Sequence, residues 1–143
     1  MGITLAEFLK YSDDVEIIIP KIYADDLKNI KHKKAFVTED LAERVKTITQ
    51  QSDKIIVLPG GTGTILEIFF ANESRRAQEH NCDIIVVNSD GFYDGLRAQI
   101  ADMVARGFTG PKKFMVKFID SAAQLNEKNF DVIKDLQQCN CLG

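Results

Sequence analysis

The stretch Leu58–Phe70, LPGGTGTILEIFF, combines closely spaced glycines with a single carboxylate among apolar residues. Gly60, Gly61 and Gly63 allow a tight turn and let the backbone approach a ligand closely. If a helix follows, its free N–H groups and the positive end of its dipole favour an anion, and phosphate is the natural guest. The sequence therefore predicts a phosphate-binding loop, although the same glycines could serve only a tight strand-to-helix turn.

The better-known phosphate signatures do not fit this loop. A Walker loop requires Gly-Lys-Ser/Thr after its glycines, and no such triplet follows here. A dinucleotide fingerprint requires a third glycine at the position that Leu66 occupies. Neither a nucleoside triphosphatase nor an NAD site of that kind is indicated.

Glu67 is the acid within this apolar run, and two interpretations of it stay open. Thr64 and Glu67 have the Thr-x-x-Glu spacing of a helix capping box, which would satisfy an orphan N–H and contribute about 1 kcal/mol. The same placement points a carboxylate toward whatever the glycine loop holds, within one helical turn of a bound phosphate. Both roles are compatible with each other.

Arg44 is a second candidate, in the segment LAERVKTITQQ. On a helix, Leu41, Val45 and Ile48 form an apolar stripe, and Arg44 lies on its flank. We therefore expect a partly buried guanidinium, which suits a carboxylate or a phosphate because its charge cannot be shed. The structural alternative is a salt bridge or a side chain whose aliphatic stem covers apolar surface.

The elements that must position these residues alternate along the chain. Short segments rich in branched apolar residues predict strands of a covered parallel sheet; they are Val15–Ile19, Lys54–Leu58, Asp83–Val87 and Lys113–Ile119. Segments with apolar residues three and four apart predict helices; they are Ile3–Tyr11, Leu41–Gln51, Thr64–His80, Phe92–Arg106 and Ser121–Leu136. This alternation predicts an α/β fold with a parallel sheet and helices on both faces. Pro20–Lys34 is the longest connection without an assigned element.

Length and composition exclude several classes of protein. With 143 residues, 45% of them hydrophobic and 27% charged, we expect one globular domain spanning residues 1–143. No apolar run approaches the roughly 20 residues that span a bilayer, so no membrane partner is expected. The net charge of -3 gives no general attraction to nucleic acid, and the basic cluster Lys31–Lys34 is typical of a solvated loop.

The cysteines and the N-terminal residues favour a cytoplasmic location. Cys82, Cys139 and Cys141 form no even disulfide framework, and the last two lack the further ligands that a zinc site requires. We therefore expect reduced thiols. The opening MGITLAEFLK has no basic start followed by an apolar stretch, so a signal peptide is not predicted.

The central motif resembles that of a known family. PGGTGTILE, Pro59–Glu67, matches the PGGxGTxxE signature of the LONELY GUY family, whose members were long described as lysine decarboxylases and are regarded as phosphoribohydrolases. Further stretches resemble the family's pattern in order along the chain: MG at 1–2, IIIPK at 17–21, ER at 43–44, SD at 52–53, AQ at 77–78 and NSDGFYDGL at 88–96. The resemblance covers most of the sequence.

This resemblance implies a Rossmann-like homodimer that cleaves the N-glycosidic bond of a nucleoside 5'-monophosphate. AMP and cytokinin ribotides are the usual substrates of the family, and water completes the reaction without a cofactor or a metal. By resemblance, Glu67 and Arg44 are the catalytic residues. The residues that would hold the 5'-phosphate are Gly60, Gly61, Thr62, Gly63 and Thr64.

The sequence also departs from the family's pattern. Ala42 and Val45 replace the histidine and lysine of the family's MHERK segment, and Arg76 stands where an aromatic residue is common. Two strands and the first glycine turns of the family would precede Met1, so we expect a sheet without those N-terminal strands. Two alternatives therefore stay beside the hydrolase: a carrier of a nucleotide or of a molybdenum-type cofactor, and an inactive truncated homologue.

Overall fold

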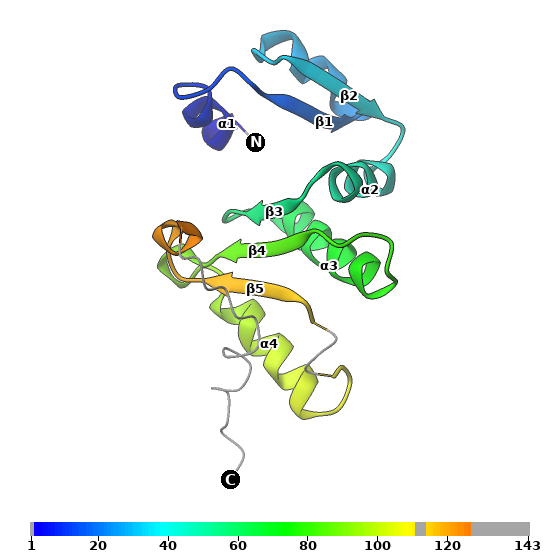
Figure 1. Cartoon of the computed structure of the whole chain (residues 1–143), viewed down its shortest axis with the longest axis vertical. Helices are drawn as coiled ribbons and strands as arrows, with labels where there is room; N and C mark the ends of the chain where they lie inside the picture. The colour runs from blue at the N-terminus through cyan, green and yellow to red at the C-terminus, as the bar shows by residue number, and fades with distance from the viewer. Residues whose placement is uncertain (1, 111–113, 127–143) are drawn as a thin grey trace. The chain divides into compact units, whose positions relative to one another are not determined.

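A computed structural model describes residues 2–110 and 114–126 of the chain. It contains two compact units, residues 1–51 and 52–143, and each is described by itself. Parallel strands flanked by helices make up both units, which confirms the predicted α/β class with a Rossmann-like arrangement (Figure 1). That the whole chain forms a single domain stays a prediction.

The first unit contains a two-stranded parallel sheet. Its elements are α1 (Gly2–Phe8), β1 (Glu16–Pro20), the 3₁₀ segment η1 (Lys21–Asn29), β2 (Lys34–Thr38) and α2 (Leu41–Gln51). The strands pair in register from Glu16 opposite Lys34 to Pro20 opposite Thr38. Val15, Ile17 and Ile19 are buried and pack against leucine and isoleucine side chains from the flanking α1 and η1 regions. Alternate residues of β1 thus give this unit its core.

A local hydrogen-bond pattern explains where α2 begins. The carboxylate of Asp40 accepts the backbone N–H of Glu43 at 2.8 Å, as an N-cap residue does. In return, the Glu43 carboxylate accepts the backbone N–H of Glu39 at 2.6 Å. This reciprocal pair resembles a capping box and satisfies donors that the first helical turn leaves without partners.

The second unit contains a three-stranded parallel sheet in the order β3-β4-β5. Its elements are β3 (Lys54–Val57), α3 (Thr62–Arg76), β4 (Asp83–Val87), the 3₁₀ turn η2 (Ser89–Gly91), α4 (Asp94–Ala105), β5 (Val116–Ile119) and the 3₁₀ segment η3 (Ala122–Asn126). Because the strands are parallel, their carboxyl ends meet at one edge of the sheet. The loops that follow β3, β4 and β5 therefore lie at that edge, where ligands bind in folds of this type.

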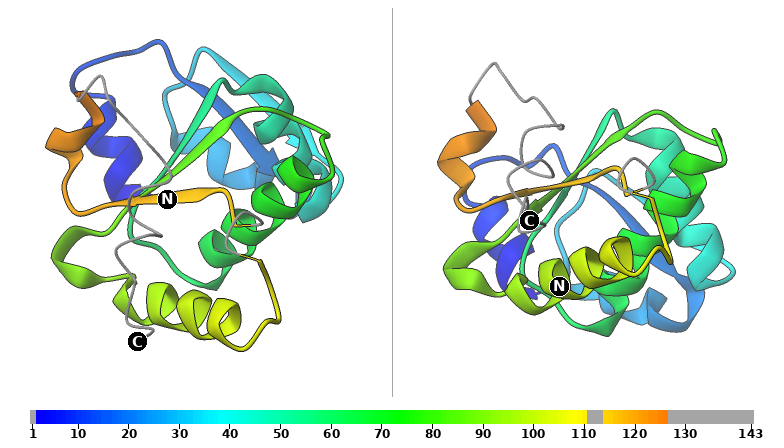
Figure 2. Two further views of the ribbon diagram at one scale, coloured as in Figure 1. Left: turned by 60° about the horizontal axis from the view of Figure 1, so that its bottom comes forward. Right: turned by 90° about the horizontal axis from the view of Figure 1, so that it is seen from below.

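Apolar side chains cover both faces of this sheet. On one face, Val57, Ile84 and Val86 pack with side chains of α3 and α4 such as Ile68 and Ile100. The opposite face carries a smaller cluster of Ile85, Val87 and Ile119, against which Leu125 of η3 packs. Both views of Figure 2 accordingly show α4 and η3 on opposite sides of β5. No helix in the described part of the chain is both long and apolar enough to span a bilayer.

The observed elements differ from the predicted ones in places. The segment Pro20–Lys34 was expected to be irregular, and it contains η1; the strand β2, which begins at Lys34, was not predicted. Of the helix predicted over Ser121–Leu136, residues 122–126 form a 3₁₀ segment, Ser121 is not helical, and residues 127–136 lie outside the described residues. The other predicted strands and helices are present with bounds shifted by up to four residues.

Candidate functional site

The glycine loop joins the carboxyl end of β3 to the start of α3. β3 ends at Val57, and α3 begins at Thr62 with Gly61 as its N-cap residue. Gly61 offers no side-chain cap, and its carbonyl accepts the N–H of Ile65 at 3.2 Å to close the first turn. The local geometry is thus the predicted one, a tight strand-to-helix turn ahead of a helix N-terminus. Its use as a phosphate site stays a prediction.

Close packing explains why Gly60 must be a glycine. A Cβ atom built there would lie 2.3 Å from the Thr64 hydroxyl oxygen and 2.9 Å from the Thr64 Cβ, which is far inside contact distance. Gly61 and Gly63 differ, since a Cβ at either position would meet no atom within 4 Å. One glycine therefore lets the loop close against the first turn of α3, and the other two leave open space beside the backbone. Open space beside backbone N–H groups is what a phosphate requires.

The capping box proposed for Thr64 and Glu67 is not formed. That motif needs threonine at the N-cap position, and the helix starts two residues earlier than expected, so Thr64 lies inside its first turn. The reason is that the chain turns at Gly60 and Gly61, which brings Thr62 into the helix. This result removes one of the two explanations for an acid at this place.

Glu67 lies on α3 about one turn beyond Thr64, on the part of the helix nearest the loop. Its side chain is half-buried, between the exposed Leu66 and the fully buried Ile68. The carboxylate is therefore at the boundary of the core rather than within it. Its predicted catalytic role is not tested by the geometry.

Arg44 lies on α2 in the first unit, and it is half-buried as predicted. Its Nε donates a hydrogen bond of 3.0 Å to the carbonyl of Ile18 in β1. The guanidinium therefore holds α2 to the strand, which gives it a structural function in addition to its predicted one. Residues 60–64 and Glu67 lie together in the loop and the first turns of α3, in the second unit. Arg44 belongs to the first unit.

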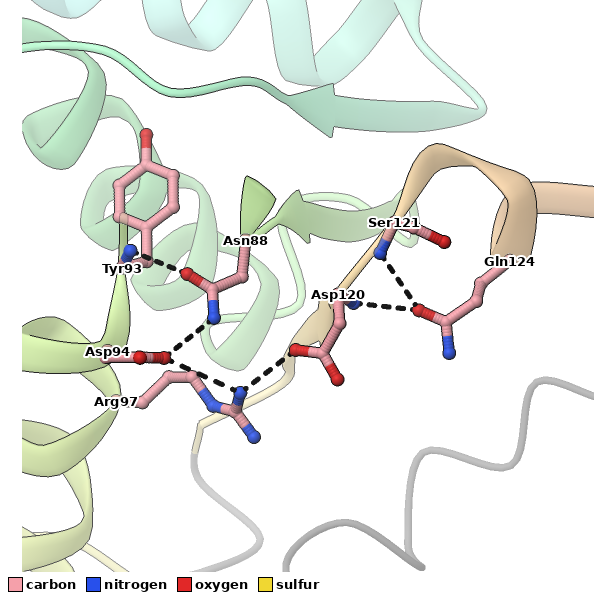
Figure 3. A network of polar contacts seen from close by, with 7 residues as sticks. All are labelled: Asn88, Tyr93, Asp94, Arg97, Asp120, Ser121 and Gln124. Carbon is pink, nitrogen blue, oxygen red and sulfur yellow. Dashed lines mark hydrogen bonds and ion pairs between the residues drawn. The ribbon is translucent and has the colours of Figure 1, made fainter. Parts of the chain in front are cut away.

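Sequence reasoning missed a polar network at the carboxyl ends of β4 and β5 (Figure 3). Asn88 follows β4 directly and is buried; its side-chain oxygen accepts the Tyr93 N–H at 2.6 Å, and its amide nitrogen donates to Asp94 at 2.8 Å. Arg97 of α4 then contacts Asp120, the residue after β5, at 3.3 Å. Asn88, Tyr93 and Asp94 entered the sequence analysis only as part of the NSDGFYDGL stretch, because nothing in their local pattern shows which strand ends they join.

The network reaches the glycine loop through Tyr93. This side chain is 2% exposed, and its hydroxyl donates a hydrogen bond of 2.8 Å to the carbonyl of Leu58. Burial raises the pKa of Tyr93, and a hydrogen bond with the Gly60 backbone partly offsets that rise. The phenol is therefore a neutral donor at physiological pH.

The positions that depart from the family pattern have ordinary environments. Val45 is 4% exposed, so an apolar side chain suits it. Ala42 is exposed on the first turn of α2. Arg76 forms an ion pair with Glu73 in the last turn of α3, where a cation also favours the helix dipole.

The basic cluster Lys31–Lys34 is partly neutralised by neighbouring acids. Lys33 pairs with Asp14 at 2.7 Å, and Lys31 lies 3.7 Å from Asp13. Both pairs are exposed, so they contribute little to stability. They do reduce the positive charge that this segment presents.

Of the three cysteines, Cys82 lies in the described part of the chain. Cys82 is a free, buried cysteine, and burial raises the pKa of its thiol. The other two, Cys139 and Cys141, lie outside the described residues.

Comparison with known proteins adds a family and several relatives. A family model described as "Possible lysine decarboxylase" matches residues 1–128. A cytokinin riboside 5'-monophosphate phosphoribohydrolase of Mycobacterium tuberculosis is 34% identical over 95 residues, which are 66% of this chain and 51% of that protein. A protein of the same name from Mycobacterium marinum is 28% identical over 112 residues, which are 75% of this chain and 60% of that protein.

A plant relative gives a similar match. A "Probable cytokinin riboside 5'-monophosphate phosphoribohydrolase" of Oryza sativa subsp. japonica is 29% identical over 109 residues, 76% of this chain and 49% of that protein. The chain thus spans about half to three fifths of the length of these curated relatives.

Proposed function

The chain belongs to the family described as possible lysine decarboxylases, and we propose that it is a phosphoribohydrolase acting on a nucleoside 5'-monophosphate. The observation that carries the proposal is the glycine loop, which opens at the carboxyl end of β3 into the N-terminus of α3 with Glu67 one turn further on. Two relatives that align with more than 60% of the chain are named for that activity. A loop for an anion and a nearby carboxylate are the two parts that the reaction needs.

In this proposal the phosphate anchors the substrate at the loop. The backbone N–H groups of residues 61–64 and the positive end of the α3 dipole would bind the 5'-phosphate. The residues assigned to this role are Gly60, Gly61, Thr62, Gly63 and Thr64. Binding energy from the phosphate then places the ribose over the first turns of the helix.

Glu67 would act on the sugar. When the bond between the anomeric carbon and the base nitrogen breaks, positive charge develops on the ribose ring. A carboxylate beside that ring stabilises the transition state more than the ground state. The oxygen of a water molecule then bonds to the anomeric carbon, one of its protons passes to the departing base, and ribose 5-phosphate remains.

Arg44 is proposed as the second catalytic residue. A guanidinium can bind the phosphate or offset negative charge on the departing base. Its Nε donates to the carbonyl of Ile18, which anchors the side chain to β1. Because one donor fixes the side chain to β1, less conformational entropy is lost when it engages a substrate.

The finer features of the proposal follow the names of the relatives. We propose AMP or an N6-modified AMP such as a cytokinin ribotide as the substrate, and cytokinin biosynthesis as the pathway. A homodimer and a cytoplasmic location are proposed as well. The proposal involves no cofactor, nucleic acid or membrane partner.

A base-release assay on the intact chain tests the proposal. AMP, N6-modified AMP, CMP and GMP are each incubated with the protein, and free base is measured by chromatography. We expect release from AMP or its N6-modified form, and a fall of about 10²- to 10³-fold in kcat for Glu67→Gln, which removes the charge and keeps the shape. Glu79→Gln, an exposed acid beyond the end of α3, is the matched control.

The outcomes separate the three classes raised by the sequence. Release of base that Glu67→Gln does not reduce would contradict the role of Glu67. A monophosphate that binds tightly and is not cleaved would support the carrier instead. Absence of both binding and cleavage would support the inactive homologue.

A further inference from the structure

A buried tyrosine reaches the backbone of the glycine loop from another part of the second unit. The ring of Tyr93 is 2% exposed and packs in the core formed by β3, β4, α3 and α4. Its hydroxyl donates a hydrogen bond of 2.8 Å to the carbonyl of Leu58, across 35 residues of sequence. Leu58 is the residue that joins the end of β3 to Pro59 and the glycines.

Leu58 directly precedes Pro59, and Gly60 directly follows it. Pro59 has no N–H of its own to donate, and its ring fixes its backbone φ angle. The hydrogen bond from a rigid, buried hydroxyl to Leu58 therefore fixes the path of the backbone where it enters the loop. Gly61, which follows Gly60, is the N-cap of α3, so this path sets where the N–H groups of its first turn lie.

The loop needs such a support because its own residues provide few side-chain contacts. Gly61 has no side-chain cap, and neither Gly61 nor Gly63 has an atom within 4 Å of the position a Cβ would take. Gly60 does pack closely against Thr64. Glycines lose more conformational freedom on ordering than other residues, so a loop built from them is costly to hold in one shape.

Tyr93 is itself held in place by Asn88 (Figure 3). The backbone N–H of Asn88 donates to the carbonyl of Ile119 at 2.7 Å, and its side-chain oxygen accepts the N–H of Tyr93 at 2.6 Å. Its side-chain nitrogen donates to Asp94 at 2.8 Å. Asn88 thus connects the end of β5, through its backbone, to the start of α4, through its side chain. It thereby fixes Tyr93, the residue that contacts the loop.

We propose that Tyr93 is a positioning residue for ligand binding by the glycine loop. Its hydroxyl holds Leu58 so that the N–H groups at the start of α3 face a phosphate before the ligand arrives. Preorganisation of this kind strengthens binding because less ordering remains to be done on association. The inference rests on the proposed function of the loop as the site of the 5'-phosphate.

The test replaces Tyr93 by phenylalanine in the intact chain. This change removes the hydroxyl and keeps the ring, so the core stays filled. We expect KM and the dissociation constant for AMP to rise about three- to tenfold, the change that the loss of one net hydrogen bond produces. We expect kcat to stay within about twofold, because uniform binding is lost rather than transition-state stabilisation. Tyr11→Phe, which removes the hydroxyl of an 82% exposed tyrosine, is the matched control.

Amide hydrogen exchange provides a readout that does not depend on activity. In the ligand-free protein, the N–H of Ile65, which donates to the Gly61 carbonyl at 3.2 Å, should exchange several-fold faster in Tyr93→Phe than in the wild type or in Tyr11→Phe. Strand amides of β4 should be unchanged, which separates a local effect on the loop from a general loss of stability. If Tyr93→Phe does not fold, the same exchange measurement on Asn88→Ser tests the support one step earlier.

The possible results distinguish this inference from the proposed function. If the wild type binds AMP and Tyr93→Phe binds it with the same affinity, the positioning role is overturned and the proposed function is left intact. Unchanged exchange at the N–H of Ile65 also overturns the positioning role. A wild type that binds no monophosphate overturns the proposed function, while faster exchange in Tyr93→Phe would still show that the hydroxyl orders the loop.

Discussion

At the scale of single residues, the three glycines of the loop have different physical requirements. Gly60 packs against Thr64 so closely that a methyl group has no space, whereas Gly61 and Gly63 face open space. None of the three adopts the left-handed backbone conformation that only glycine tolerates well. The need for glycine at position 60 is therefore steric, and at positions 61 and 63 the proposed reason is access for a ligand.

Alanine substitutions separate these requirements. Gly60→Ala should lower the free energy of unfolding by about 1–3 kcal/mol, because the new Cβ must displace Thr64 or the backbone. Gly61→Ala should change it by less than about 1 kcal/mol in either direction, since its Cβ meets nothing. Urea denaturation followed by circular dichroism measures both. Equal losses for the two variants would contradict the steric explanation.

At the scale of helices and strands, elements with a strong local signal were predicted well. α2 was predicted with its observed bounds, because its apolar stripe begins directly after Asp40. The carboxylates of Asp40 and Glu43 cap the helix at that point. β4 was also predicted with its observed bounds, since a buried parallel strand is a continuous run of branched apolar residues. β2 was missed because its residues are mostly half-buried or exposed and it begins inside a basic cluster.

The parts of the candidate site with a local sequence signal were also predicted, and the parts that depend on distant contacts were not. The glycine loop and Glu67 lie in one continuous stretch whose chemistry can be recognised locally. The bonds from Arg44 to Ile18 and from Tyr93 to Leu58 join residues 26 and 35 positions apart. Such contacts depend on how the strands are ordered in the sheet, and no periodic pattern encodes that order. The capping box predicted for Thr64 and Glu67 was wrong for a related reason, since the observed start of α3 depends on the turn before it.

The cap of α2 makes a prediction at this scale. Asp40→Ala removes the acceptor of the Glu43 N–H, so it should destabilise the first unit by about 1 kcal/mol. Asp26→Ala, an exposed acid on η1, is the matched control and should be neutral within about 0.5 kcal/mol. Thermal denaturation at pH 7 compares the two variants with the wild type. A loss no greater than that of the control would show that the cap does not contribute.

At the scale of the whole molecule, the sheets have edges that invite association. Within the described residues, β3 pairs with β4 alone, so its other edge has no strand partner in that sheet. Ile56 on β3 is 48% exposed, and Leu58 just beyond the strand is 39% exposed. Open strand edges with exposed apolar residues tend to pair with another chain unless they are covered. A second copy of the chain pairing at this edge would form the proposed homodimer.

The proposed dimer makes the last prediction. Light scattering after size-exclusion chromatography should give a mass twice the 16.0 kDa of one chain. Ile56→Lys should shift the protein toward monomer at micromolar concentration, because a charge at an apolar edge opposes pairing with a second copy. Ile22→Lys introduces the same charge at an 80% exposed residue of η1 and should leave the mass unchanged. A wild-type mass of a single chain would contradict association, whereas a dimer unaffected by Ile56→Lys would place the interface on another surface.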